Sequence, residues 1–309
     1  MKILMICSKF PYPPNDGGSI AMYNMVQSFH EEGHEVSVLA MNTPKHRIAN
    51  IGELPEEAQM KANWSAVEVN TNLNFWDMFS NLLFDDVSYH VVRFESESFR
   101  DELERILAKD AFDVVQMETL FMMNYLDTVR EKAPKAVVAL RAHNVEHEIW
   151  ERRAKKEKNF VKKIYLEETA KRLRDFERVA MGKSTFDLVI PITDRDKKQF
   201  GEFTKEYVNQ IMATVEKKGS TDQKFLDQLT ENGVEDWVID KFKKEGPVDP
   251  IKRRIKNQLK LAPKYHVSQV GMGFENLDKY MDAPRNSDAN LIIFIGALDW
   301  TPNQEGLDW

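Results

Sequence analysis

The stretch KILMIC at residues 2–7, followed by SKFPYPPNDGGSIAMYN at residues 8–24, decides the fold class. A short apolar run of this kind is typical of a buried strand. The chain then crosses three prolines and places two adjacent glycines, Gly17 and Gly18, just before a helix-like segment. Two glycines at the start of a helix indicate that some group must approach the backbone there. The stretch therefore predicts a strand, a loop and a helix with a close contact at the glycines.

Similar apolar runs recur along the chain and alternate with helix-like segments. We predict strands at KILMIC (2–7), EVSVLAM (35–41), SAVEV (65–69), DVVQM (113–117), AVVALRA (136–142) and DLVIPI (187–192). Their continuous apolar character indicates strands that are covered on both faces. The predicted helices are Ser19–Gly33, Asn74–Phe84, Ser96–Lys109, Thr119–Lys132 and Glu146–Met181. This alternation predicts an α/β fold with a doubly wound parallel sheet.

The composition and the spacing of apolar residues change after residue 203, which we interpret as the end of a first domain. Residues 204–264 are rich in Lys and Glu and carry apolar residues at helical spacing, so we predict a helical insertion with its own small cluster. We expect this cluster to form through Val208, Met212, Trp237 and Phe242. Strand-like runs at 266–270 and 290–297 follow, and we interpret 265–309 as a linker and the start of a second domain.

Composition excludes several classes of protein. The chain has 309 residues and a net charge of -7, which gives no general reason to expect nucleic acid as a partner. A single cysteine, Cys7, excludes a disulfide within the chain and fits a reducing compartment. The first apolar run is too short for a signal peptide, and no run of about 18 apolar residues occurs. We therefore expect a cytoplasmic protein.

Candidate site residues follow the predicted strands, because ligands of such sheets bind outside the carboxyl ends of the strands. They are Asp16, Gly17 and Gly18 after the first strand, Glu118 after the fourth, His143 and Asn144 after the fifth, and Thr193 and Asp194 after the sixth.

The two glycines have two explanations. Amides without side chains at a helix N-terminus can bind a phosphate, because the helix dipole and the unpaired N–H groups favour an anion. Alternatively, Gly17 and Gly18 form a tight turn that only requires a positive φ. A dinucleotide fingerprint is poorly supported, because the pattern is not G-x-G-x-x-G.

His143 can hydrogen-bond a sugar hydroxyl or a phosphate and can transfer protons near neutral pH. The alternative is a structural histidine whose hydrogen bonds are satisfied within the fold. A metal site with His147 is disfavoured, because the two histidines are placed on different elements and no Cys or third His supports zinc. Thr193 has a sufficient structural explanation as a helix N-cap. Glu118 has no such structural explanation, so we favour it as a residue of the binding cleft.

The segment Arg152–Arg174 is strongly basic. It contains ten lysines and arginines against three glutamates, a net charge of +7, with Phe160, Ile164, Tyr165 and Leu166 interleaved. A helix of this kind can lie on an anionic membrane surface. It can equally be a solvated helix whose apolar stripe faces the core.

Taken together, these motifs resemble a known family. The opening residues 2–41, LRAHNVEHEIWERRA at 140–154 and DLVIPITDRDKKQF at 187–200 resemble family 4 of the retaining glycosyltransferases, which have the GT-B fold of two Rossmann-like domains. LIIFIGALDWTPNQEGLDW at 291–309 resembles the start of the second, donor-binding domain.

The resemblance implies a hexosyltransferase-type enzyme that transfers a sugar from a nucleotide-sugar to a glycan or lipid-linked acceptor in cell-envelope or exopolysaccharide synthesis. It implies no metal cofactor. By this resemblance Gly17 and Gly18 approach the donor diphosphate, and His143 contacts the transferred sugar. The acceptor side would be formed by Asp16, Glu118, Asn144, Thr193 and Asp194.

The sequence also departs from this family. The chain ends before the donor-binding motifs of the second domain, so we expect little or no glycosyl transfer from this chain as given. One alternative is a non-catalytic module that binds an acceptor, a membrane or a protein partner. Another is a nicotinamide-dependent oxidoreductase, which shares the fold class but needs a dinucleotide fingerprint.

Overall fold

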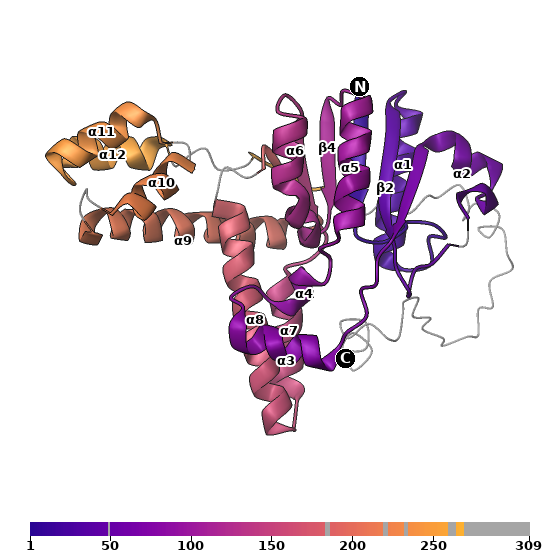
Figure 1. Ribbon diagram of the computed structural model, residues 1–309, viewed down its shortest axis with the longest axis horizontal. Helices are drawn as coiled ribbons and strands as arrows, with labels where there is room; N and C mark the ends of the chain where they lie inside the picture. The colour runs from indigo at the N-terminus through magenta and orange to yellow at the C-terminus, as the bar shows by residue number, and fades with distance from the viewer. Residues whose placement is uncertain (49, 183–185, 219–221, 232–233, 259–263, 269–309) are drawn as a thin grey trace, which may run out of the picture.

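A computed structural model describes residues 1–268 except 49, 183–185, 219–221, 232–233 and 259–263. Its centre is one parallel seven-stranded sheet in the order β3-β2-β1-β4-β5-β6-β7 (Figure 1). The strands are β1 (Lys2–Cys7), β2 (Glu35–Asn42), β3 (Asn63–Glu68), β4 (Val114–Glu118), β5 (Val137–Ala142), β6 (Leu188–Pro191) and β7 (Lys264–Tyr265). The order runs outward in both directions from β1 and β4, so the predicted doubly wound, Rossmann-like α/β fold is confirmed.

The predicted strands need few corrections. The first six fall within two residues of their expected starts, and of the strand expected at 266–270 the last two residues lie outside the described part of the chain. The described pairing begins two residues earlier, at Lys264, and continues as backbone hydrogen bonds from His266 to Val189 and from Ser268 to Pro191. The strand expected at 290–297 and most of the segment 265–309 lie outside the described residues.

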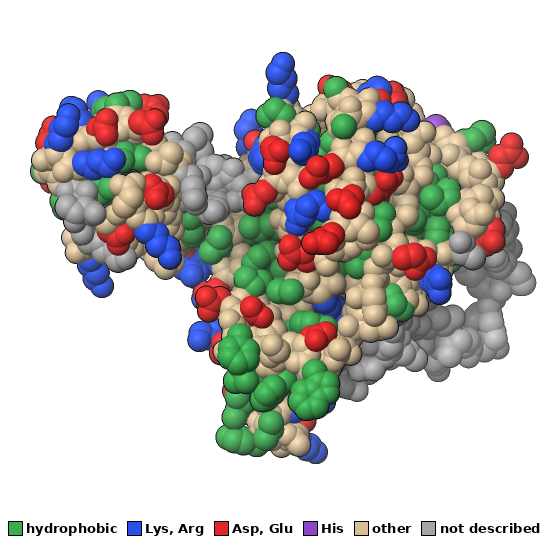
Figure 2. Space-filling view, viewed as in Figure 1, with side chains coloured by type: hydrophobic (Ala, Val, Ile, Leu, Met, Phe, Trp, Pro, Cys, Tyr) green, Lys and Arg blue, Asp and Glu red, His purple; other side chains and the backbone are tan. Residues whose placement is uncertain are grey.

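The helices cover both faces of the sheet. They are α1 (Gly17–Glu31), α2 (Glu56–Lys61), α3 (Phe75–Phe84), α4 (Tyr89–Val92), α5 (Glu97–Lys109), α6 (Leu126–Lys132), α7 (Glu146–Lys156), α8 (Phe160–Gly182) and α9 (Asp194–Lys218), with 3-10 turns η1 (Ile51–Glu53) and η2 (Leu120–Tyr125). Charged side chains gather on the outer surfaces of α5 and α6 (Figure 2). This is the distribution expected of amphipathic helices over a core.

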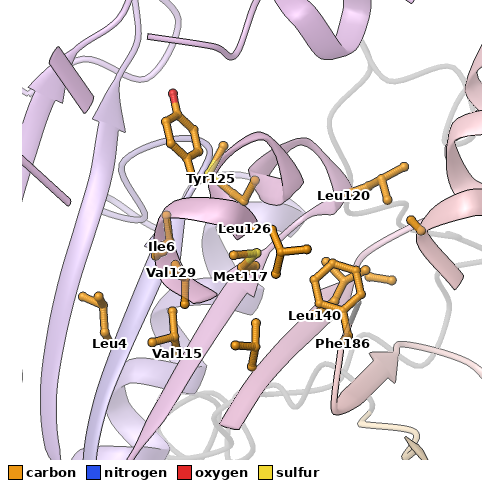
Figure 3. Close-up of a cluster of buried hydrophobic side chains, with 14 of the residues drawn as sticks. Leu4, Ile6, Val115, Met117, Leu120, Tyr125, Leu126, Val129, Leu140 and Phe186 are labelled. Carbon is orange, nitrogen blue, oxygen red and sulfur yellow. The ribbon is translucent and has the colours of Figure 1, made fainter. Parts of the chain in front are cut away.

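The core is divided by the sheet into two layers. Leu4 and Ile6 of β1 point to one side and Ile3 and Met5 to the other, because successive side chains of a strand alternate. On the first side they meet side chains of β4, η2 and α6, among them Val115, Met117, Tyr125, Leu126 and Val129 (Figure 3). On the other side they meet Met22 and Val26 of α1.

The single long helix expected over Glu146–Met181 is wrong. The chain forms two helices, α7 and α8, which pack side by side and are separated by Glu157, Lys158 and Asn159 (Figure 1). Side chains hold this turn: Glu157 accepts the backbone N–H of Asn159, and Asn159 accepts that of Lys162. The expected helix over Thr119–Lys132 likewise divides into η2 and α6, and the short elements η1, α2 and α4 had not been predicted.

A separate helical cluster follows the sheet. It consists of the second half of α9 with α10 (Gln223–Glu231), α11 (Asp236–Glu245) and α12 (Asp249–Gln258), around a buried core that includes Phe242. Val208 and Met212 pack on this core, but Trp237 does not: it is 42% exposed and its ring lies against Arg254. The boundary expected between 203 and 204 falls inside α9, which runs through it without a break.

Within the described part of the chain, none of the helices combines the length and apolar character needed to cross a bilayer.

Candidate functional site

The carboxyl ends of β1, β4 and β5 lie side by side at the point where the strand order reverses. Cys7 of β1 is in register with Glu118 of β4, and Glu118 is in register with Arg141 of β5. Side chains that follow these strands are therefore brought to one edge of the sheet, where ligands bind in this architecture. We call this edge the rim.

Glu118 and His143 form a hydrogen-bonded pair at the rim. His143 Nε2 lies 2.6 Å from Glu118 Oε2, and Gln116 donates to Oε1 at 2.6 Å. Glu118 is fully buried, whereas the side chain of His143 keeps 9% of its exposure. A cation beside this pair is Arg141, whose Nη1 lies 3.6 Å from Glu118 and donates to the backbone carbonyl of Ala21 in α1. The carboxylate of Glu118 is therefore enclosed by His143, Gln116 and Arg141.

These contacts determine the charge of Glu118 and the tautomer of His143. Burial alone would raise the pKa of Glu118, but the hydrogen bond and charge of His143, with the charge of Arg141, lower it. An ionised carboxylate only accepts hydrogen bonds, so His143 Nε2–H is the donor. In neutral His143 the other nitrogen, Nδ1, is then an acceptor for a hydroxyl group.

Thr119, directly after Glu118, has a strained backbone. Its φ is +83°, a left-handed value that is uncommon for a β-branched residue, and its Oγ1 is buried without a hydrogen-bond partner. Its N–H donates to the carbonyl of Arg141. Strain of this kind is found at functional sites, where the surrounding structure holds it in place.

The glycine pair lies in the first turn of α1. Asp16 is the N-cap, and its Oδ1 accepts the N–H groups of Gly18 and Ser19 at 2.9 and 3.0 Å. Lys9 Nζ donates to the same oxygen at 2.5 Å. Burial would raise the pKa of Asp16, but the hydrogen bonds from Lys9 and Ser19 lower it to about 2. Asp16 is thus an ionised helix cap.

The group that comes close to the glycines is Lys9. A Cβ built on Gly18 would lie 2.9 Å from Lys9 Nζ, whereas one on Gly17 would meet nothing within 4 Å. Neither glycine has a positive φ, so a tight turn is not the reason for the pair. The structure places an ammonium group and a helix N-terminus together at the rim.

Asn144 extends from His143 toward a buried carboxyl group. Its Nδ2 donates to Glu146 Oε1 at 3.4 Å. Burial and the neighbouring Glu177 raise the pKa of Glu146 to about 8, against smaller effects of Asn144 and Arg93. Glu146 is therefore mainly protonated at neutral pH.

A second histidine–glutamate pair lies at the start of α7, four residues further along the chain than His143. His147 Nδ1 is 2.5 Å from Glu177 Oε2, and both side chains are buried. Glu177 also accepts the backbone N–H groups of Glu146 and His147 at the start of α7. Burial raises the pKa of Glu177 despite these bonds. Glu177 of α8 thus caps the N-terminus of α7. The sequence did not predict this pair, because no local pattern relates His147 to Glu177, which lies 30 residues further along the chain.

Thr193 and Asp194 follow β6 and are exposed. Thr193 Oγ1 accepts the N–H of Asp196 at 3.1 Å, which confirms the expected N-cap. Since β5 lies between β6 and β4, the two residues stand at the same edge of the sheet as Glu118 but one strand beyond the His143 loop.

Metal ligands are not grouped in the described residues: no three His, Cys, Asp or Glu side chains there are placed to hold an ion.

Comparisons with known proteins give only distant structural likenesses. No family model and no curated protein matches the sequence. An α-glucosyltransferase in complex with UDP and a 13-mer DNA is similar at 14% identity and a TM-score of 0.30, over 63% of this chain and 37% of that one. Arabidopsis thaliana UGT89C1 complexed with UDP-L-rhamnose is similar at 13% identity and a TM-score of 0.38, over 68% and 49%. The same protein complexed with UDP is similar at 13% identity and a TM-score of 0.35, over 69% of this chain and 49% of that one.

The chain thus spans less than half the length of each of these structures. At such identities and TM-scores, the function has to be argued from the site itself.

Proposed function

We propose that this chain carries the acceptor-side domain of a retaining, nucleotide-sugar-dependent glycosyltransferase that acts on a glycan or lipid-linked acceptor of the cell envelope. The sequence resemblance to family 4 supports the proposal. The observation that carries it is the rim: His143, oriented by the buried Glu118, stands at the switch point of a parallel sheet beside a helix N-terminus and the Lys9 ammonium group.

Each rim residue has a role in this proposal. His143 Nδ1 accepts a hydrogen bond from a hydroxyl of the transferred sugar, and Glu118 positions the ring from its buried side. Gly17 and Gly18 let the diphosphate approach the first turn of α1; because Asp16 already accepts the N–H groups of Gly18 and Ser19, the positive charge for it comes from Lys9. These groups would stabilise the leaving diphosphate without a metal ion.

The acceptor would approach from the loops that follow β5 and β6, where Asn144, Thr193 and Asp194 lie. In the reaction, the acceptor oxygen forms the bond to the anomeric carbon while the bond from that carbon to the diphosphate breaks. The diphosphate leaves with the electron pair and takes up the hydroxyl proton. The alternative of a module that binds membranes without catalysis concerns a different surface, formed by α3, α7 and α8.

Ligand binding tests the proposal directly. Saturation-transfer NMR on the purified chain with a panel of UDP- and GDP-sugars, and with NADH as the competing class, should show contacts to the nucleotide-sugars. The Lys9→Gln variant should weaken the contacts of the phosphate-bearing ligand, whereas Lys135→Gln, at an exposed position before the start of β5, serves as the control. Binding of NADH with no contact to any nucleotide-sugar would contradict the proposal.

A further inference from the structure

One end of the molecule carries a concentration of exposed apolar side chains. Trp76, Phe79, Leu83 and Phe84 of α3 and Phe160, Val161 and Ile164 of α8 are all exposed, from 47% for Ile164 to 80% for Phe84. Figure 2 shows hydrophobic side chains gathered over this end, where α3 crosses the α7–α8 pair. We call these seven residues the apolar tip. Exposed apolar surface of this extent is typical of an interaction site.

The two parts of the apolar tip are joined through Arg172. Its guanidinium donates to the carbonyls of Asn81 and Leu82 in the last turn of α3 at 3.0 and 2.8 Å. Phe160 and Ile164 are four residues apart along α8 and share one face of that helix, whereas Arg172 lies two turns further on and about 80° around the helix from Ile164. Arg172 therefore fixes the end of α3 against α8, the helix that carries Phe160 and Ile164.

Positive charge borders the apolar tip at the turn between α7 and α8. Residues 155–163 contain five lysines and one glutamate, a net charge of +4 in a chain whose net charge is -7. A groove of about 370 Å³ lies at this turn and is lined by Arg153, Lys156, Glu157, Lys158, Lys162 and Leu166. Glu157 is paired with Lys162 at 2.9 Å, so the groove keeps an excess of cations. In α3 and the two residues after it the balance is opposite, with Asp77, Asp85 and Asp86 exposed, so the basic border is confined to the α7–α8 turn.

We propose that the apolar tip docks on an anionic lipid bilayer. Phe160, Val161 and Ile164 enter the interface between headgroups and acyl chains, with the aromatic residues of α3 beside them, and the lysines of the turn bind lipid phosphates. Apolar side chains next to lysines are the pattern of interfacial helices, and negative lipids attract such basic segments. A two-fold contact with a second copy would instead bring like-charged lysine turns together. The proposal does not depend on glycosyl transfer.

Vesicle flotation tests this proposal. The purified chain is mixed with vesicles of phosphatidylcholine alone, or with about one third phosphatidylglycerol. We expect binding to the anionic vesicles that weakens as salt is raised, and at least tenfold weaker binding to the neutral ones.

Two sets of variants distinguish the contribution of the lysines in the α7–α8 turn from that of the apolar side chains of the tip. Lys155→Gln/Lys156→Gln/Lys158→Gln should weaken binding about a hundredfold, while Lys241→Gln/Lys243→Gln/Lys244→Gln on α11 should leave it unchanged. Phe160→Ser/Val161→Ser should weaken it at least tenfold, about what the lost burial of two apolar side chains implies. The matched control Trp237→Ser/Val248→Ser, at exposed positions of the helical cluster, should have no effect.

Three results would overturn the proposal. One is the absence of binding to anionic vesicles. Another is binding that responds to the lysine variant but not to Phe160→Ser/Val161→Ser, because adsorption would then be electrostatic only. The last is self-association of the chain without vesicles that the same serine variant abolishes, since the apolar tip would then be a contact between copies.

Discussion

Two histidines four residues apart in the sequence are each held by a buried glutamate, yet the two pairs differ in almost every other respect. The rim pair, His143 with Glu118, stands at the end of the strands and keeps some exposure. The interior pair, His147 with Glu177, is buried and joins α7 to α8. The rim glutamate has a cation, Arg141, beside it and a lowered pKa, whereas the interior glutamate lies near Glu146 and has a raised one.

The difference shows that the partner of a histidine, more than its sequence context, decides what the histidine can do. Both carboxylate oxygens of Glu177 accept hydrogen bonds, from the His147 side chain and from the backbone N–H groups of Glu146 and His147. Loss of Glu177 would therefore remove the cap of α7. Glu118 accepts only side-chain donors among its hydrogen bonds and orients a ring that still reaches the surface. The interior pair should therefore matter for stability and the rim pair for binding.

The largest effect should come from the interior pair. Glu177→Ala leaves His147 and two backbone N–H groups without their acceptor, and we expect a loss of about 3–5 kcal/mol in the free energy of unfolding. Urea denaturation measures it. Glu167→Ala, at an exposed position of the same helix, is the control and should change stability by less than about 0.5 kcal/mol. A loss below about 1 kcal/mol for Glu177→Ala would remove the distinction between the pairs.

Glu146, which lies beside the interior pair, predicts a pH dependence. The pKa of Glu146 is about 8 in the folded chain and 4.5 in the unfolded chain, so its contribution is complete below pH 4.5 and is lost as the pH rises through 8. Stability should fall by at most about 4 kcal/mol between pH 5 and 9. In Glu146→Gln, whose amide resembles the protonated acid, the urea midpoint should depend less on pH over this range. An unchanged pH dependence would show that Glu146 is ionised in the folded chain.

The cap at the rim should contribute less than the cap in the interior. Asp16→Ala removes the acceptor for Gly18, Ser19 and Lys9, and an N-cap loss of this kind costs about 1–2 kcal/mol. Because the pKa of Asp16 is about 2, below its unfolded value of 3.8, this contribution is present above pH 3.8 and is lost as the pH falls through 2. Thermal unfolding at pH 7 and pH 2.5 checks both statements, with Asn15→Ala as the control. Equal effects of Asp16→Ala at the two pH values would exclude an ionised cap.

The smallest effect on stability is expected at the glycines. Gly17→Ala should be neutral or stabilising by up to about 1 kcal/mol, since its Cβ meets open space inside a helix. Gly18→Ala should cost little as well, because the group it displaces is the flexible end of Lys9, but it should weaken nucleotide-sugar binding more than Gly17→Ala does. Calorimetry of unfolding and ligand titration distinguish the two, and equal binding by both variants would refute a role for the close approach.

Much of this fold could be predicted, because strands that are buried on both faces of a sheet have continuous apolar sequences. Residues 2–7 form β1 over the expected range, and the rim residues follow from the ends of the strands. The break at Glu157–Asn159 could not be predicted, since it contains neither Gly nor Pro and is fixed by side-chain bonds to the backbone. The helical spacing of apolar residues predicted Trp237 in the core of the helical cluster. The structure has the neighbouring Val238 in that core instead.

The candidate site was predicted only in part. The proximity of Glu118 and His143 follows from the parallel sheet, but their bond and the burial of Glu118 do not. Arg141 was a usable signal, because a charge inside an apolar strand has to find a buried partner. His147 and Glu177 are 30 residues apart on helices whose break was not foreseen, so their pairing required the structure.

The most direct test compares His143→Gln with His147→Gln in one experiment that measures both nucleotide-sugar affinity and the urea midpoint. For His143→Gln we predict affinity reduced about tenfold or more, the size of one lost hydrogen bond, with less than about 1 kcal/mol of stability lost. For His147→Gln we predict the reverse: a clear loss of stability, and unchanged affinity under conditions where the variant is folded. Unchanged affinity in His143→Gln, or a loss of stability equal to that of His147→Gln, would contradict the assignment of His143 to the site.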